Sequence, residues 1–566
     1  MSLSSLKWSR KTLGPDLMSG LTVALVSIPE GMAYAMVAGV NPVYGFYTGM
    51  VTTIVASLTG STSLLVVTLT NALALVTADA IAGLEGPVDI TTVFALTFLV
   101  GLIMFLLGAL KLGSVIRFVS KEVMAGFVFA TALLIVLGQY GDLVGYESTL
   151  EGANKLFKAV DITLNISNWD IYTAIVGFSS IVLLFGMKRI RAIEKWADIL
   201  LIVLSSLFVA IVGWATVELV GDIADVPQGL SALPKPTLPD FSMLPVLIAP
   251  AIAAAVVGLA ESSGVGSAYP NPDGTKSNMS QDFTSQGLGN LVGSFFQALP
   301  AGGSLSRTGV NAGGGAMSRW SGVYAGLMLA VVIVVAGGAT EYIQMSGLAA
   351  LLIVIGIEAM EKEGRVLGRA RRLSMANSGV ALIVIIIAVF EDLTVAIFAG
   401  VILSLLAYTF RAAGAARVVQ LVRTEDDKIE ERLAATELEP NKPVVFELIG
   451  EVYFASVYSF DEMAPPPDSG GNTVVIMRLR GRHFYSLTWI EWFEDYNKKL
   501  EAHGNKLMLE GVDEELMSVL KASGLLEEIG EEYVFEDHPK RGEALDAARE
   551  KAWEWIRSTK PARTEE

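Results

Sequence analysis

Long apolar stretches recur along the chain up to about residue 411, and short polar turns separate them. Many reach roughly 18 residues, the length at which a helix crosses the hydrocarbon core of a bilayer. The pattern predicts an α-helical polytopic membrane protein with fourteen spans. The predicted spans are 17–39, 44–59, 64–83, 91–110, 117–139, 171–187, 197–219, 245–267, 283–299, 304–316, 320–340, 344–360, 374–390 and 393–411.

The charges between the spans predict their orientation. With the N-terminus inside, the inner loops are basic and the outer loops are mainly acidic. The inner loops carry Lys111, Arg117, Lys121, Lys188, Arg189, Arg191, Lys195, Lys362, Arg365, Arg369, Arg371 and Arg372. Because basic loops stay in the cytoplasm, we expect an even number of spans in a bacterial inner membrane. The N-terminus and everything after the last span would then be cytoplasmic.

The two halves of this region share a pattern. A shift by seven spans places the third span on the tenth, and these are the two spans that are short or polar. It also places the first span on the eighth, two small-residue runs that reach Glu30 and Glu261. Seven is odd, so the second half must be inverted. A seven-plus-seven inverted repeat with matching broken helices is typical of transporters that bind their substrate at the midplane.

The tenth span holds an arginine in apolar surroundings. Residues 299–315 read LPAGGSLSRTGVNAGGG and include Ser304, Ser306 and Arg307. An arginine at the bilayer centre costs about 2.5–3.5 kcal/mol, so it needs a wet cavity or a partner. Pro300 and the glycines interrupt the backbone, and Ser304 can cap a new helix whose N-terminus attracts an anion. The alternative is a buried polar bend that packs helices together.

Other polar residues lie in the first and third spans. Pro29 is expected to break the first span and to present Glu30 at membrane depth, where burial favours the protonated carboxyl and allows proton coupling. The alternative is a neutral acid bonded to a neighbouring helix. Thr68, Thr70 and Asn71 are expected to face the start of the tenth span. Alternatively, the threonines bond back to their own helix.

Glu261, at the end of the eighth span, precedes Ser262 and Ser263. It has three open interpretations: an ion pair with Arg307, a protonated acid, or a ligand for a cation such as sodium.

The composition of the chain excludes several classes of site and function. The chain has no cysteine, so it has no disulfide and no thiolate metal site. Its histidines, His483, His503 and His538, all follow the spans, which excludes a histidine proton relay in the membrane. The net charge of −17 argues against a nucleic-acid partner. Since no catalytic dyad, metal cluster or phosphate loop is found, we expect no enzyme, no metal and no cofactor other than a coupling ion.

The composition changes after residue 411. We expect a charged linker over 412–440, a small α/β domain over 441–540, and a charged helical or disordered tail over 541–566. Within the domain, KPVVFELIGEVYFAS predicts a strand, a turn and a further extended piece. Two more strands are expected at TVVIMRLRG and NKLMLEGV. Two helices are expected, ending at Gly504 and at Gly524.

Several stretches of the chain resemble those of a known family of transporters. DLMSGLTVALVSIPEGMAYAMVAGVNPVYGFYTG, LGSVIRFVSKEVMAGFVFATALLIVLGQ and LSRTGVNAGGGAMSRWSGV are similar to SulP anion permeases, which include sulfate and bicarbonate permeases and prestin. Residues 441–540 resemble the STAS domain of that family. The resemblance implies a core of spans 1–4 and 8–11 that moves, elevator-like, against a gate of spans 5–7 and 12–14. It also implies a homodimer with cytoplasmic STAS domains.

The resemblance also implies the site. It places the anion between the starts of spans 3 and 10, at Glu30 and its neighbour Tyr34, at Thr70, and at Ser304, Leu305, Ser306 and Arg307. Many animal members carry glutamine where this chain has Glu30, and the difference favours proton coupling. The STAS segment RGRHFYSLTWIEW, with Ser486 and Thr488, lacks the Asp-Ser-Ser-Gly phosphorylation loop of regulatory domains.

We therefore expect a secondary active anion transporter, with proton-coupled sulfate uptake as the leading function. The expected substrate site is Glu30, Tyr34, Thr68, Thr70, Asn71, Ser304, Leu305, Ser306 and Arg307, and the expected coupling-ion residues are Glu30 and Glu261. Two alternatives within the class are sodium-dependent bicarbonate transport and proton-coupled dicarboxylate (fumarate) transport. Alternatives of another class are a passive anion channel and a membrane-tethered STAS regulator.

Overall fold

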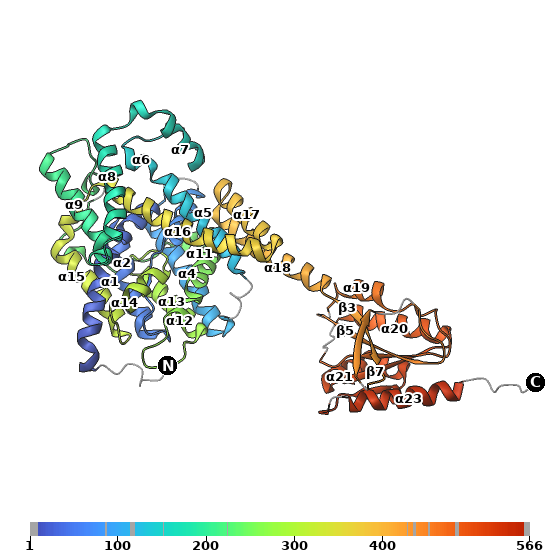
Figure 1. Ribbon diagram of the computed structural model, residues 1–566. Coiled ribbons are helices and arrows are strands. Elements are labelled where there is room, and N and C mark those ends of the chain that lie inside the picture. Colours follow the sequence, from blue (N-terminus) through green and yellow to red (C-terminus); the bar gives the residue numbers. More distant parts are fainter. Residues whose placement is uncertain are drawn as a thin grey trace, which may run out of the picture. The chain divides into compact units, whose positions relative to one another are not determined.

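The computed structural model describes residues 9–84, 88–113, 119–150, 152–223, 225–426, 428–433, 437–450, 453–481, 486–540 and 542–559. The chain divides into two compact units, one up to Ser404 and one from Leu405. The first is a bundle of helices and the second is a sheet with helices on its faces (Figure 1).

Each of the fourteen predicted spans coincides with a helix in the described part of the chain. The first seven are α1 (Arg10–Val37), α2 (Val43–Thr59), α3 (Asn71–Ala82), α4 (Ile90–Ala109), α5 (Lys121–Gly138), α8 (Ile171–Lys188) and α9 (Ala197–Val212). The second seven are α11 (Leu244–Ser263), α13 (Met279–Ser294), α14 (Leu305–Gly313), α15 (Trp320–Ala336), α16 (Met345–Leu373), α17 (Met375–Phe390) and α18 (Leu393–Gly414). Short helices lie between them: α6 (Tyr140–Val144), α7 (Lys155–Leu164), α10 (Val220–Ile223) and α12 (Val265–Ala268).

The third and tenth spans are each a short strand followed by a half-helix. Strand β1 (Val67–Thr68) precedes α3, and strand β2 (Gly302–Gly303) precedes α14. The two strands pair antiparallel, Val67 with Gly303 and Thr68 with Gly302. Equivalent elements of the two halves therefore meet in opposite directions, as an inverted repeat requires.

The expected break at Pro29 is wrong, because α1 runs as one helix through that proline. A proline removes one backbone hydrogen bond and strains the preceding turn, but packing holds this helix on both sides of it. A Cβ atom placed on Gly45 of α2 would collide with the carbonyl oxygen of Gly31 in α1. Such close backbone contact keeps α1 in place against α2.

A second close backbone contact in the first unit joins α4 and α13. A Cβ on Gly101 would lie 2.6 Å from the backbone nitrogen of Leu291, and a Cβ on Gly287 would collide with that of Phe105. The helices therefore touch along their backbones, as small residues allow in membrane proteins.

The second unit is built on a six-stranded sheet in the order β4-β3-β5-β6-β7-β8. The strands are β3 (Arg417–Arg423), β4 (Ile429–Leu433), β5 (Pro443–Ile449), β6 (Val474–Arg478), β7 (Lys506–Val512) and β8 (Val534–Glu536). Strands β5, β6, β7 and β8 run parallel to one another, whereas β3 pairs antiparallel with β4 and β5. The helices are α19 (Val457–Met463), α20 (Leu487–Ala502), α21 (Glu514–Ser523), α22 (Leu525–Ile529) and α23 (Glu543–Thr559).

Two expectations for this part of the chain are corrected, and a third is decided. Strands β3 and β4 lie inside the expected linker, 412–440; Val419 and Leu421 of β3 are buried against one face of the sheet, whereas β4 is exposed along its length. The piece expected to be extended after β5, up to Ser456, forms a bend and a turn over residues 453–456, and α19 follows it. Helix α23 occupies most of the expected tail, 541–566, so the helical alternative is correct, and it packs Leu545 and Ile556 against the sheet.

Candidate functional site

Arg307, in the first turn of α14, is the centre of the site. Its side chain is 1% exposed, and Nη2 lies 3.0 Å from Oε2 of Glu30. Nη1 donates to the carbonyl oxygen of Leu69, just ahead of α3, at 2.9 Å. The guanidinium stands over the ring of Tyr34, 5.8 Å from its centroid. The structure thus brings together Arg307, Glu30 and Tyr34, and it gives Arg307 Glu30 as its ion-pair partner.

The two half-helices begin beside this arginine. Ser304 caps α14 by accepting from the N–H of Arg307 at 3.3 Å, and Thr70 caps α3 by accepting from the N–H of Leu73 at 3.3 Å. The Thr70 hydroxyl donates to Oε2 of Glu261 at 2.8 Å. Helix N-termini carry partial positive charge and unpaired N–H groups. Two such N-termini and a buried guanidinium give this place groups that can attract an anion.

Four of the predicted site residues have other surroundings. Thr68 is buried within β1, opposite Gly302. Ser306 is exposed, and Leu305 packs against an apolar cluster. The side chain of Asn71 accepts from the N–H of Ala72 in its own helix, at 2.7 Å. Among the described residues, no hydrogen bond or ion pair joins these four side chains to that of Arg307.

A scan against family models matches residues 13–386 to the sulfate permease family and residues 434–540 to the STAS domain. The chain belongs to the sulfate permease family. The first match covers most of the transmembrane helices and the whole site around Arg307. The permease is therefore a multi-pass membrane transporter of anions with a C-terminal STAS domain, and it is not an enzyme.

Relatives and solved structures agree with this assignment. "Probable sulfate transporter Rv1739c" of Mycobacterium tuberculosis (strain ATCC 25618 / H37Rv) is 26% identical over 561 residues, which are 95% of this chain and 96% of that protein. The structure of SLC26A9 superposes with a TM-score of 0.82 at 18% identity, covering 96% of this chain and 91% of that one. The transmembrane domain of the cyanobacterial bicarbonate transporter BicA gives a TM-score of 0.58 at 21% identity, covering 71% of this chain and 98% of that one. At these identities, the structures establish the fold.

Sequence reasoning missed the polar residues that hold the strands of this permease. On α13, Gln286 accepts from the N–H of Gly303 at 2.9 Å, and Asn290 makes two 2.8 Å bonds to the backbone of Ala301. On α2, Thr53 donates to the carbonyl oxygen of Val67 at 2.7 Å. In the sequence these residues are marked only by an amide or hydroxyl at helical spacing in an apolar span. That pattern does not identify their hydrogen-bond partners.

Thr308, the residue after Arg307, helps to hold the backbone of the site. Its Oγ1 accepts from the N–H of Val66 at 3.1 Å, so the first turn of α14 is tied to the strand that precedes α3. The backbone around the site is therefore fixed by side chains of the permease itself.

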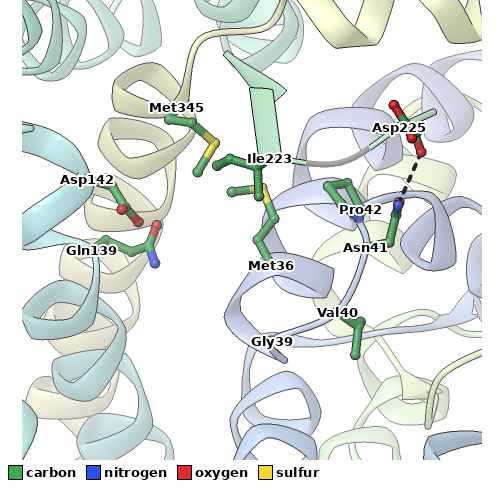
Figure 2. A pocket seen from close by; sticks show the side chains of 10 residues that line it. All are labelled: Met36, Gly39, Val40, Asn41, Pro42, Gln139, Asp142, Ile223, Asp225 and Met345. Carbon is green, nitrogen blue, oxygen red and sulfur yellow. Dashed lines mark hydrogen bonds between the residues drawn. The ribbon is translucent and has the colours of Figure 1, made fainter. Parts of the chain in front are cut away.

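A cavity of about 600 Å³ lies beyond the C-terminal end of α1 (Figure 2). One wall includes Met36, in the last turn of α1, and Asn41, in the loop after it, whereas Gln139 and Asp142 on the other wall come from the junction of α5 and α6. Met36 is less than two helical turns from Glu30 along α1. In the orientation predicted for this permease, the cavity opens on the outer side.

Proposed function

We propose that this permease takes up sulfate with protons across the bacterial inner membrane, and that a core of spans 1–4 and 8–11 moves against a gate of spans 5–7 and 12–14. The Arg307–Glu30 ion pair carries the proposal. While Glu30 is ionised, its carboxylate neutralises the guanidinium of Arg307 and keeps it in the ion pair. When Glu30 is protonated, the charge of Arg307 is free to bind an anion.

The remaining contacts of Arg307 support this exchange of partners. Its Nε atom is buried and has no hydrogen-bond acceptor among the described residues. A guanidinium offers donors in a fixed fork that suits oxyanions such as sulfate. We propose that the anion takes this donor together with N–H groups at the starts of α3 and α14.

The membrane potential gives a reason for proton coupling. Moving one charge against it costs about 2.3 kcal/mol per 100 mV, so uptake of a dianion into a negative cell needs accompanying cations. A proton on Glu30 supplies one of them in the same step that prepares Arg307.

Uptake of radiolabelled sulfate into proteoliposomes tests the proposal. We expect an inward proton gradient to accelerate uptake in the wild type, and Glu30→Gln to abolish this dependence on pH. The control is Glu361→Gln, which changes an exposed glutamate on α16 and should leave the dependence intact. Sulfate uptake indifferent both to the gradient and to Glu30→Gln would refute proton coupling.

One observation favours a second candidate, sodium-dependent bicarbonate transport. Glu261 and Thr70 place a carboxylate and a hydroxyl oxygen 2.8 Å apart beside the start of α3, and hard cations bind such oxygens. Competition by sulfate, fumarate and bicarbonate, with and without sodium, separates the substrates. A passive channel would pass current without saturation, whereas a tether would keep its function after Arg307→Ala.

We also propose that the protein works as a homodimer with cytoplasmic STAS domains. The basic inner loops support this orientation. The mass of the detergent-solubilised protein tests the dimer, and protease access to the STAS domain in inverted vesicles tests the orientation.

A further inference from the structure

Three helices of the proposed gate hold a charged cluster beside the core. Lys188, at the end of α8, donates to both carboxylate oxygens of Glu358 on α16 at 2.9 Å. Its Nζ also lies 3.6 Å from Oδ1 of Asp198, in the first turn of α9. We call Lys188, Asp198 and Glu358 the gate triad. Two carboxylates against one ammonium leave it a net charge of −1.

Helix packing connects the gate triad to Glu30. Helix α1, which carries Glu30, packs against both α9 and α16. All three members of the triad act electrostatically on Glu30, and Glu30 acts on Lys188 in return. The triad belongs to helices of the gate, whereas Glu30 and Arg307 belong to helices of the core.

The other groups around Glu30 are few. Arg307 reaches it from α14, and Tyr34 of α1 stands against that arginine. Helices α2 and α15, which also pack against α1, contain no acidic or basic residue. The only charged residue of α3 is Asp79, near its far end. On the gate side, Asp198 is the one charged residue of α9 and Glu358 is the first of α16. The other charged residues of α16, from Glu361 to Arg372, lie further along that helix.

We propose that the gate triad ties the protonation of Glu30 to the position of the core. When Glu30 faces the triad, the net negative charge favours a proton on Glu30 and an unneutralised Arg307. When the core moves away, that influence is lost and the Glu30–Arg307 pair re-forms without the proton. The charge of the gate thereby determines whether Glu30 of the core is protonated. The two sites are linked by a coupling free energy. The inference rests on the proposed function, since it assumes that Glu30 carries the coupled proton.

Opposite changes in the charge of the triad must shift the pH dependence of sulfate uptake in opposite directions. Lys188→Met makes the triad more negative, so the pH at half-maximal sulfate uptake should rise by roughly 0.5–1 unit, the range expected for one charge in a partly exposed cluster. Glu358→Gln makes the triad less negative, so the same midpoint should fall by a similar amount. The double variant restores the net charge of −1 and should return close to the wild-type midpoint. A role only in packing would lower uptake in both single variants without opposed shifts.

Radiolabelled sulfate uptake by the full-length protein in proteoliposomes, measured over a pH series, decides between these outcomes. Arg365→Gln is the control, because Arg365 is an exposed basic residue on α16, the helix of Glu358, and pairs with Glu361. This variant should leave the pH midpoint of uptake unchanged. In a Glu30→Gln background, Lys188→Met should also leave the profile flat. If Glu30→Gln flattens the profile but neither triad variant shifts it, the inference is overturned and the proposed function stands. If wild-type uptake is independent of pH, both are overturned.

Discussion

At the scale of single residues, the sequence predicts Arg307 well and its surroundings poorly. A lone arginine among glycines in an apolar stretch is conspicuous in one dimension, and so is Glu30 after a proline. That these two form the ion pair, while Glu261 bonds to Thr70, depends on distances across the fold. No spacing along the chain encodes those distances, so the sequence left the partner of Glu261 open.

Removal of the arginine alone should be worse than removal of both partners. In Arg307→Ala, Glu30 remains buried without a cation, and such a loss is worth about 3–5 kcal/mol of unfolding free energy. In Arg307→Ala with Glu30→Ala, the uncompensated charge is gone and part of the loss is recovered. Denaturation in mixed micelles measures both free energies. Equal destabilisation of the two variants would contradict a buried, ionised pair.

At the scale of elements, length and periodicity predict the spans because lipid imposes one helix length on most of them. The half-helices α3 and α14 are predictable too, since glycines and polar residues interrupt their spans. The continuity of α1 through Pro29 is not, because it depends on contact with α2. Strand β3 escaped notice because its short apolar run lies among charged residues, and β4 because it is mostly charged and exposed along its length.

The seam between α4 and α13 should not tolerate a methyl group. Gly287→Ala would drive a Cβ into the backbone of Phe105, and overpacking of this kind costs about 1–3 kcal/mol or more. Gly379→Ala on α17 is the control, because nothing lies within 4 Å of a Cβ at that position. The yield of folded protein on size-exclusion chromatography and the denaturation midpoint compare the two. A Gly287→Ala protein as stable as the control would show that the backbones do not touch.

At the scale of the whole molecule, the second unit has its own apolar cores on the two faces of its sheet. An acid is buried among them. Glu510 of β7 is 0% exposed, and its Oε2 lies 3.3 Å from Nε of Arg478 on the neighbouring strand β6. Burial raises the pKa of Glu510 above its ordinary value of 4.5 despite that arginine. The folded unit therefore binds the proton of Glu510 more tightly than the unfolded chain does.

The stabilisation from this proton should be complete below about pH 4.5 and should decline as the pH rises through the raised pKa. Glu510→Gln cannot ionise, so its stability relative to wild type should improve between pH 4 and 7, by roughly 1.4 kcal/mol for each unit of pKa shift. Hydrogen exchange of the β7 amides in the full-length protein, compared between variants at each pH, measures the difference. A gap between variants that is constant over this range would contradict the assignment.

The pairing of β1 with β2 has a consequence for how the protein is made. Val66 and Thr308, which bond beside this pairing, are 242 positions apart, so most of the membrane part is synthesised between them. Until the later segment arrives, the backbone ahead of α3 has no partner and cannot rest against lipid. The nascent first half must therefore wait in a sheltered, hydrated environment, and the two halves mature together as one cooperative assembly. A truncated chain that ends before β2 should be recognised by cellular quality control and degraded.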